Sequence, residues 1–199
     1  MRIGVIDYGM GNLYSVEQAL LRLGADVMVT SDVAELEAAD ALVLPGVGAF
    51  PDAMERLTEV GLTDYVRNTK KPLLGICLGM QLMFESSVEV RETKGLGIFK
   101  GRIERFNGVS RVPHMGWNDL QFTSGEQVAD AYVYFVHSFY GVGFDASELV
   151  AYADYEGVQV PAVVAKNNFT GMQFHPEKSG AMGIELLKQW MEKAGATVC

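Results

Sequence analysis

Short apolar runs alternate with amphipathic segments along the first half of the chain. Four runs rich in aliphatic and β-branched residues are typical of buried strands, and they lie at positions 2–7, 26–30, 41–44 and 73–76. Residues 12–23 carry leucine and valine at helical spacing before Gly24, and residues 54–69 form a second predicted helix. Because helices alternate with strands, we expect right-handed crossovers and an open, mostly parallel sheet with helices on both faces.

The second half of the chain has a different pattern, with short β-rich pieces separated by glycine turns. These pieces are predicted to be antiparallel and to extend or flank the main sheet, and they lie at positions 97–106, 131–136, 149–155 and 158–164. A further strand at 169–174 and a final helix at 183–193 complete the pattern. Since the sequence has no repeat, low-complexity tract or linker, we expect residues 1–199 to form one α/β domain.

Composition narrows the class of protein. Of 199 residues, 49% are hydrophobic and 21% are charged, which is typical of a globular protein. The net charge of −9 argues against general nucleic-acid binding, because phosphate neutralisation needs clustered lysine and arginine. The two cysteines, Cys77 and Cys199, are too few for a disulfide framework. No apolar stretch approaches the ~20 residues that span a bilayer, and the first residues lack a signal-peptide pattern, so we expect a cytoplasmic location.

A cysteine between glycines follows the predicted strand 73–76, in the stretch GICLGMQ. In an open parallel sheet, ligands bind beyond the carboxyl ends of the strands. Small residues permit a sharp turn from strand to nucleophile to helix, and the free N–H groups of that helix stabilise a thiolate. The stretch therefore predicts Cys77 as a nucleophile and the N–H of Leu78 as an oxyanion donor. The alternative is that Cys77 is a small core residue, as most free cysteines are.

The stretch QFHPE at positions 173–177 offers a base for this nucleophile. His175 follows a predicted strand, and Glu177 lies two residues later, beyond the rigid Pro176. A carboxylate held against an imidazole provides both the base and the group that orients it. The alternative is a surface turn that contains a histidine and a glutamate by chance.

A second glycine-rich turn, PGVGAF at positions 45–50, ends the predicted strand 41–44. Glycines at the carboxyl end of a strand free backbone N–H groups to face a ligand. Beside a nucleophile turn, Val47 or Gly48 would supply the second half of an oxyanion hole. The alternative is an ordinary tight turn.

Taken together, GICLGMQ and FHPE resemble the class I (triad) glutamine amidotransferases, in which a Cys–His–Glu triad hydrolyses the side-chain amide of glutamine. Five further blocks resemble the glutaminase subunits of imidazole glycerol phosphate synthase, and these blocks are IDYGMGNLYSV, PGVGAF, VPHMGWN, YFVHSFY and QFHPEKSG. The resemblance extends over nearly the whole chain.

The resemblance implies a role for individual residues. Cys77 would be the nucleophile, His175 the general base and then acid, and Glu177 its orienter. The backbone of Val47 and Leu78 would form the oxyanion hole. The residues implied in glutamine binding are Gly48, Gln81, Glu89, Ser138 and Phe139. The residues implied at a partner interface are Asn12, Trp117, Tyr134, Lys178 and Ser179. The family often has tyrosine at the position of Phe139, a change of little consequence if only the backbone is used.

The same resemblance implies a reaction and a partner. Glutamine would be hydrolysed to glutamate and ammonia. The ammonia would pass to a separate cyclase subunit with a (β/α)8 barrel, in a heterodimer that makes imidazole glycerol phosphate and aminoimidazole carboxamide ribotide for histidine and purine synthesis. No cofactor is implied. His114 and His137 have no metal-ligand spacing with Cys77 and are predicted to be packing residues.

Three other interpretations compete with this one. GMGNL at positions 9–13 suggests a dinucleotide-binding turn, but Tyr14 occupies the place of the third glycine. The glutaminase of pyridoxal phosphate synthase shares the triad, but it carries Gly-Gly-Glu-Ser where this chain has PGVGAF. An amidotransferase-like module that only binds would have no physical need for Cys77, His175 and Glu177 together.

Overall fold

A large mixed sheet runs through the centre of the protein. The computed structural model describes residues 1–125, 128 and 130–198, so Cys199 lies outside the described residues. The strand order of the main sheet is β2-β1-β3-β4-β14-β13-β12-β9. The parallel part consists of β2 (Asp26–Thr30), β1 (Arg2–Ile6), β3 (Ala41–Leu44), β4 (Leu73–Ile76) and β14 (Phe169–Met172). The antiparallel extension consists of β13 (Val158–Lys166), β12 (Leu149–Tyr155) and β9 (Gln121–Phe122).

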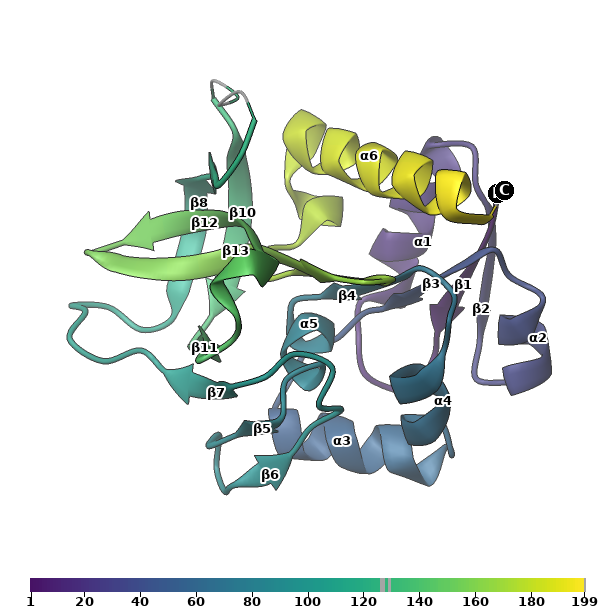
Figure 1. The fold of residues 1–199 in the computed structure, drawn as a ribbon, viewed down its shortest axis with the longest axis horizontal. Helices are drawn as coiled ribbons and strands as arrows, with labels where there is room; N and C mark the ends of the chain where they lie inside the picture. Colours follow the sequence, from purple (N-terminus) through teal and green to yellow (C-terminus); the bar gives the residue numbers. More distant parts are fainter. Residues whose placement is uncertain (126–127, 129, 199) are drawn as a thin grey trace.

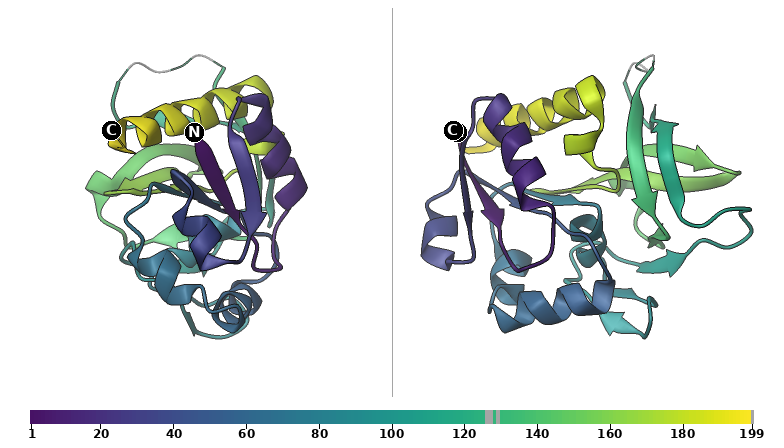
Figure 2. Two further views of the ribbon diagram at one scale, coloured as in Figure 1. Left: turned by 90° about the vertical axis from the view of Figure 1, so that its right-hand side faces the viewer. Right: turned by 180° about the vertical axis from the view of Figure 1, so that it is seen from behind.

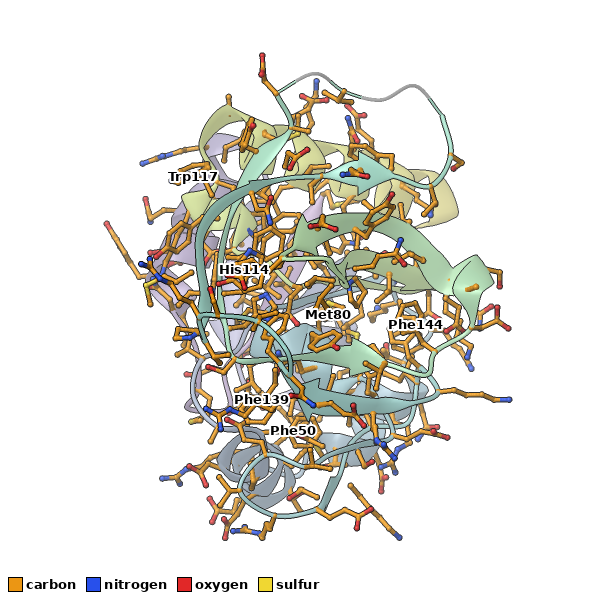
Figure 3. All side chains as sticks on the ribbon, turned by 90° about the vertical axis from the view of Figure 1, so that its left-hand side faces the viewer. Phe50, Met80, His114, Trp117, Phe139 and Phe144 are labelled. Atoms are coloured by element: carbon orange, nitrogen blue, oxygen red, sulfur yellow. The ribbon has the colours of Figure 1, made fainter. Side chains whose placement is uncertain are left out.

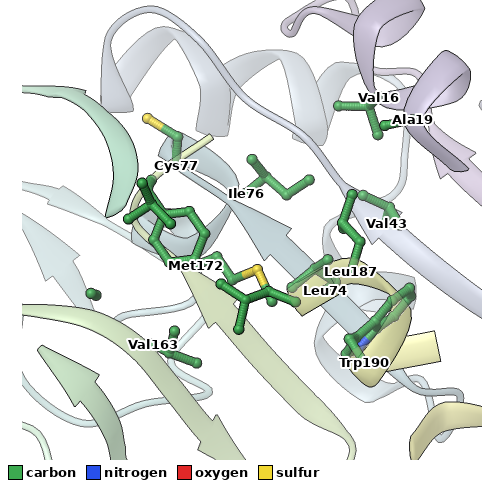
Figure 4. Packing of buried hydrophobic residues seen from close by; sticks show 14 of the residues in the cluster. Val16, Ala19, Val43, Leu74, Ile76, Cys77, Val163, Met172, Leu187 and Trp190 are labelled. Atoms are coloured by element: carbon green, nitrogen blue, oxygen red, sulfur yellow. The ribbon is translucent and has the colours of Figure 1, made fainter. Parts of the chain in front are cut away.

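Helices cover both faces of the parallel part (Figures 1 and 2). One face carries α1 (Leu13–Arg22) and α6 (Gly180–Val198), and the other carries α2 (Val33–Glu37), α3 (Phe50–Glu59), α4 (Thr63–Asn68) and α5 (Leu78–Leu82). Each face has its own hydrophobic cluster. Figure 4 shows part of the first, in which Leu187 and Trp190 of α6 pack near Val43 and Leu74 of the sheet. Because β3 and β4 are buried along their whole length, their sequences are unbroken apolar runs.

Two smaller, mostly antiparallel sheets lie beyond the carboxyl ends of the central strands (Figure 1). One is a two-stranded ribbon of β8 (His114–Asp119) and β10 (Tyr132–His137). The other is a four-stranded sheet of β11 (Phe139–Val142), β7 (Arg102–Arg105), β5 (Ser86–Ser87) and β6 (Thr93–Lys94). Two short 3-10 turns complete the structure, η1 (Ala146–Glu148) and η2 (Pro176–Lys178). Among the described helices, none is long and apolar enough to cross a membrane.

The predicted fold class is confirmed, with differences in particular elements. The predicted helix 54–69 is wrong, because α3 begins earlier, at Phe50, and Gly61 at a φ of 75° separates it from α4. The predicted strand 97–106 is formed only at Arg102–Arg105, since Phe99 turns into the core beside Phe84. Strand β8 and helix α2 were not predicted, and α6 is longer than residues 183–193.

Candidate active site

Cys77 stands at the turn between β4 and α5. Its φ of 53° and ψ of −111° are unusual for a residue with a side chain, and such strain costs of order 1–3 kcal/mol. The backbone N–H of Cys77 donates to the carbonyl of Met172 at 2.7 Å, which ties the turn to β14. The thiol is nearly buried, and in Figure 4 its sulfur points away from the labelled aliphatic side chains. The surrounding structure therefore holds the thiol in a fixed, strained position.

Glycines allow this turn to pack backbone against backbone. A Cβ atom on Gly79 would lie 1.9 Å from the carbonyl oxygen of Leu44, and one on Gly46 would lie 2.7 Å from the nitrogen of Gly79. The first turn of α5 thus rests directly on the end of β3. Because the first N–H groups of a helix have no intrahelical acceptor, the N–H of Leu78 is left for another partner.

His175 and Glu177 form a buried pair on η2, next to the end of β14. The Nδ1 atom of His175 lies 2.8 Å from Oε1 of Glu177, and the two side chains are only 3% and 1% exposed. Ser179 Oγ donates to the carbonyl of His175 at 2.6 Å and accepts from the N–H of Tyr134 at 2.9 Å. The His175 N–H donates to the carbonyl of Tyr134 at 3.0 Å, so strand β10 and η2 hold the backbone of His175 together.

The electrostatics of His175 follow from its two neighbours. Burial alone lowers the pKa of His175, but hydrogen bonds and charge interactions with Cys77 and Glu177 outweigh burial and raise the pKa to about 9. The imidazole therefore favours its protonated form, and it lies between the Cys77 sulfur and the Glu177 carboxylate.

One pocket of about 350 Å³ brings the predicted site residues together. Its lining consists of Val47, Gly48, Cys77, Leu78, Gln81, Glu89, Pro113, Val136, His137, Ser138, Phe139 and His175. Pro113, Val136 and His137 were not predicted as site residues, and their place in the VPHMGWN and YFVHSFY blocks is the only signal in the sequence that points to them. A larger hollow of about 670 Å³ lies at the opposite edge of the sheet, before β3 and β4, and is remote from Cys77.

Two of the predicted substrate-binding residues already have partners. Gln81 uses its amide nitrogen to donate to the carbonyl of Phe139 at 2.9 Å, which leaves its own carbonyl oxygen for a ligand. Glu89 accepts from the N–H of Phe50 at 2.8 Å and so caps the start of α3. Burial raises the pKa of Glu89, the Phe50 hydrogen bond opposes this, and the charge of Asp52 adds to it.

The glycine-rich loop after β3 is held by a residue that sequence reasoning missed. Tyr8 is buried, and its hydroxyl donates to the carbonyl of Pro45 at 2.8 Å. Burial, together with the nearby charge of Cys77, raises the pKa of Tyr8 far above its usual value, so the phenol stays a donor. Gly48 has a φ of 113°, which only glycine adopts readily, and Val47 beside it is partly exposed.

The predicted interface residues divide into exposed and buried side chains. Trp117 is 56% exposed, lies at the edge of the molecule in Figure 3, and contacts Tyr134 edge to face at 6.1 Å between ring centroids. Lys178 is exposed, and half-buried Asn12 caps α1 by accepting from the N–H of Ser15. The Ser179 side chain is buried, and its hydroxyl donates to the backbone carbonyl of His175.

His114 and His137 are buried and hydrogen-bonded to each other, with 3.0 Å between Nδ1 of His114 and Nε2 of His137. In Figure 3, His114 lies toward the centre of the view, away from the outline where Trp117 lies. Among the described residues, no group of three or more histidine, cysteine, aspartate or glutamate side chains could hold a metal ion.

Comparison with known proteins places this chain among its relatives. The family model for glutamine amidotransferase class-I matches residues 4–194. The imidazole glycerol phosphate synthase subunit HisH of Geobacillus thermodenitrificans (strain NG80-2) is 50% identical over 202 residues, covering 95% of this chain and 94% of that protein. The protein of the same name from Shouchella clausii (strain KSM-K16) is 53% identical over 201 residues, covering 94% and 96%.

Two solved structures show the same fold at lower identity. A crystal structure of a glutamine amidotransferase has a TM-score of 0.77 at 24% identity, over 97% of this chain and 98% of that chain. The structure of PurLQS from Thermotoga maritima includes a chain with a TM-score of 0.71 at 20% identity, over 100% and 99%. From the family model and the sequence relatives, this chain belongs to the class I glutamine amidotransferases and, within them, to the family of the imidazole glycerol phosphate synthase subunit HisH.

Proposed function

We propose that this chain is the glutaminase subunit of an imidazole glycerol phosphate synthase, with Cys77 as nucleophile, His175 as general base and acid, and Glu177 as its orienter. The observation that carries the proposal is the convergence of a strained thiol and a carboxylate-paired imidazole in one pocket of about 350 Å³. Residues 1–199 would act as a single domain in the cytoplasm.

The proposed reaction begins with attack on glutamine. The Cys77 thiolate attacks the side-chain carbonyl carbon, and the N–H groups of Leu78 and Val47 bind the oxyanion that forms. The His175 imidazolium then protonates the nitrogen, which leaves as ammonia, and a glutamyl thioester remains. Neutral His175 next takes a proton from water, the hydroxyl group adds to the thioester, and glutamate leaves with the thiolate restored.

The pocket supports recognition of the amino-acid end of glutamine. The free carbonyl oxygen of Gln81 would accept from the substrate ammonium, with the Glu89 carboxylate close by. Ser138 and Phe139 also line the pocket. Since the Phe139 side chain packs against the second hydrophobic cluster, a missing tyrosine hydroxyl at this position should have little effect on binding.

Delivery of ammonia requires a second chain. The relatives at about 50% identity are named as synthase subunits, and the described residues of this chain form an open sheet rather than a barrel. Exposed Trp117 and Lys178 lie on the ribbon and the turn that border the proposed triad, where a cyclase subunit with a (β/α)8 barrel would dock to form a heterodimer. We expect low activity from the isolated chain, because docking would complete the oxyanion hole.

The test is release of glutamate from glutamine by the purified chain, alone and with the cyclase subunit of a relative and its ribonucleotide ligand. We expect hydrolysis with the partner, loss of it in Cys77→Ser, and retention in the matched control Cys199→Ser, which alters the other cysteine. Hydrolysis that persists in Cys77→Ser would exclude Cys77 as the nucleophile. Absence of hydrolysis under every condition would exclude the proposed pairing.

A further inference from the structure

A line of hydrogen bonds that the proposed mechanism does not use runs from strand β8 to the Cys77 sulfur. Its members, in order, are Asn118, His114, His137, the carbonyl of Phe139, Gln81, Gln173 and Cys77. These residues come from β8, β10, β11, α5 and the end of β14, and all the side chains between Asn118 and Cys77 are buried.

The carbonyl of Phe139 fixes the direction of this line. His137 Nδ1 lies 2.8 Å from the carbonyl oxygen, and Gln81 Nε2 lies 2.9 Å from it. A carbonyl oxygen only accepts, and it has two lone pairs. Both neighbours must therefore donate, so His137 carries its proton on Nδ1 and Gln81 turns its amide nitrogen toward β11.

The orientation of Gln173 follows from that of Gln81. Gln81 Nε2 lies 3.1 Å from the end of the Gln173 amide, so that end must be the acceptor, Oε1. The other end, the amide N–H of Gln173, then faces the Cys77 sulfur at 3.9 Å. Gln173 is fully buried, so the surrounding protein leaves this amide without contact with bulk water.

The two histidines, His114 and His137, continue the line from the Phe139 carbonyl to Asn118, and the same rule fixes which of their ring nitrogens donate and which accept. Because His137 is protonated on Nδ1, its Nε2 accepts, and His114 must donate from Nδ1 at 3.0 Å. The Nε2 atom of His114 accepts in turn from Asn118 at 3.3 Å, while Asn118 also donates to the carbonyl of Asp154 at 2.8 Å. Protonation of either imidazole would set two donors face to face.

Burial keeps both imidazoles neutral. Desolvation lowers the pKa of His114 to about 4, with its ring stacked between Phe135 and Tyr155 at 4.5 and 4.0 Å. Desolvation also lowers the pKa of His137, to about 3. The Phe139 hydrogen bond opposes that shift, and His114 and His175 add to it. With both imidazoles neutral, the side chains of the line from Asn118 to Gln173 carry no charge at neutral pH.

We propose that Gln173 is a further residue of the catalytic site, whose amide N–H stabilises the Cys77 thiolate, and that Gln81, His137 and His114 are positioning residues that fix which end of the amide faces the sulfur. The inference rests on the proposed role of Cys77 as nucleophile. A reversed amide would place a carbonyl oxygen against the thiolate and disfavour it, so the orientation matters as much as the residue type.

The first test measures the pH dependence of Cys77 alkylation by iodoacetamide, in the full chain with Cys199→Ser. Gln173→Met keeps the side-chain length without the donor. Gln173→Glu keeps the acceptor toward Gln81 but replaces the N–H that faces the sulfur. We expect the alkylation midpoint to rise by about one pH unit in Gln173→Met, which is about tenfold less thiolate at a given lower pH, and further in Gln173→Glu.

The matched control is Gln159→Met, the same change at an exposed position of β13, and its midpoint should equal that of the parent chain. Unchanged midpoints in both Gln173 variants, with the chain folded by circular dichroism, would overturn the role of Gln173.

The second test measures the protonation and tautomers of the two histidines in the line, without any substitution. Nitrogen-15 NMR of the imidazole rings should show His114 and His137 as neutral Nδ1–H tautomers between pH 8 and pH 5.5. Protonation of either ring in this range, or an Nε2–H tautomer, would overturn the proposed polarity even if the Gln173 variants failed to fold.

A pair of His137 variants separates positioning from packing. Asparagine places an N–H where the imidazole has Nδ1, whereas leucine offers only bulk. We expect His137→Leu to raise the alkylation midpoint and His137→Asn to return it toward the parent value. Equal midpoints in the two variants would remove the histidine from the positioning role.

These measurements need neither glutamine nor the partner. Glutamine hydrolysis with an unchanged alkylation profile would therefore reject the role of Gln173 alone. A shifted profile without hydrolysis under any condition would reject the proposed function alone.

Discussion

Replacement of Gly79 by alanine tests the packing on which the turn that carries Cys77 depends. The added methyl group would lie 1.9 Å from the carbonyl oxygen of Leu44 and 2.9 Å from its carbonyl carbon. Ordinary contact begins near 3.4 Å, so the two backbones must separate by about 1.5 Å. A flexible side chain cannot relieve this contact, because both groups are backbone. Leu44 is the end of β3, and Gly79 lies in the first turn of α5.

The structure allows the cost of this change to be approximated. Overpacking of a core costs about 1–3 kcal/mol when side chains can adjust, and a forced backbone shift belongs at the upper end of that range. For a chain of this size, about 3 kcal/mol lowers the unfolding midpoint by roughly 6–12 °C. A displacement of about 1 Å at the reacting groups also costs on the order of 100-fold in rate, here in partner-supported glutamine hydrolysis.

Gly195→Ala is the matched control for this prediction. Gly195 lies within α6, and the nearest atom to an added methyl group is the flexible end of Met1 at 3.2 Å. Alanine in place of glycine should stabilise the helix by up to about 1 kcal/mol, so the two substitutions should shift the unfolding midpoint in opposite directions. Thermal unfolding by circular dichroism and the glutaminase assay would decide. Equal midpoints and equal activities in the two variants would refute the backbone packing described at the turn.

Three further predictions concern the buried titratable side chains and the exposed Lys178 beside the proposed triad. Glu177→Gln keeps the hydrogen bond to His175 but removes the carboxylate charge, so the pKa of His175 should fall by about one to three units. The pH profile of glutamine hydrolysis should move with that pKa. An unmoved profile would contradict the pairing of His175 with Glu177. His114 and His137 stay neutral in the folded chain, whereas in the unfolded chain both bind protons below about pH 6.5. Each histidine should therefore reduce the free energy of unfolding by about 2 kcal/mol between pH 7 and pH 5, as measured by urea titration. Equal stability at the two pH values would speak against burial of neutral imidazoles. Lys178→Ala should weaken the affinity for the cyclase by a few-fold, mainly at low salt, with no change in the unfolding midpoint. Identical curves for titration of the parent and the variant with the cyclase would exclude Lys178 from the interface.

The central strands were predictable because burial on both faces produces a short unbroken apolar run, and recognising such a run does not depend on the period at which apolar residues recur. Strands β3 and β4, which are buried along their whole length, lie where the apolar runs predicted them. The break at Gly61 was not predictable in the same way, because apolar residues continue at helical spacing on both sides of it. Strand β8 was missed because its sequence, HMGWND, mixes glycine with polar residues, and it is stabilised by its partner β10 rather than by its own pattern.

The candidate site was predictable where a residue type and its place on a strand were enough. Cys77 and His175 follow β4 and β14, and those two strands are neighbours in the sheet. The burial of Ser179 and the orientation of Gln173 depend on which backbone and amide groups face each other. A sequence names such groups but does not orient them.

The position of β14 between β4 and β13 has a consequence for a chain that is still being made. Gln173, just after β14, and Cys77 are 96 positions apart, so the ribosome releases the thiol long before β14 and the His175 imidazole that follows it. Until residues 169–172 insert, β4 is an open edge, and pairing at such sequence separation is slow. Under the proposed mechanism, a nascent or prematurely terminated chain therefore has the thiol but not the imidazole that would work with it, and it would release no ammonia before the sheet is complete.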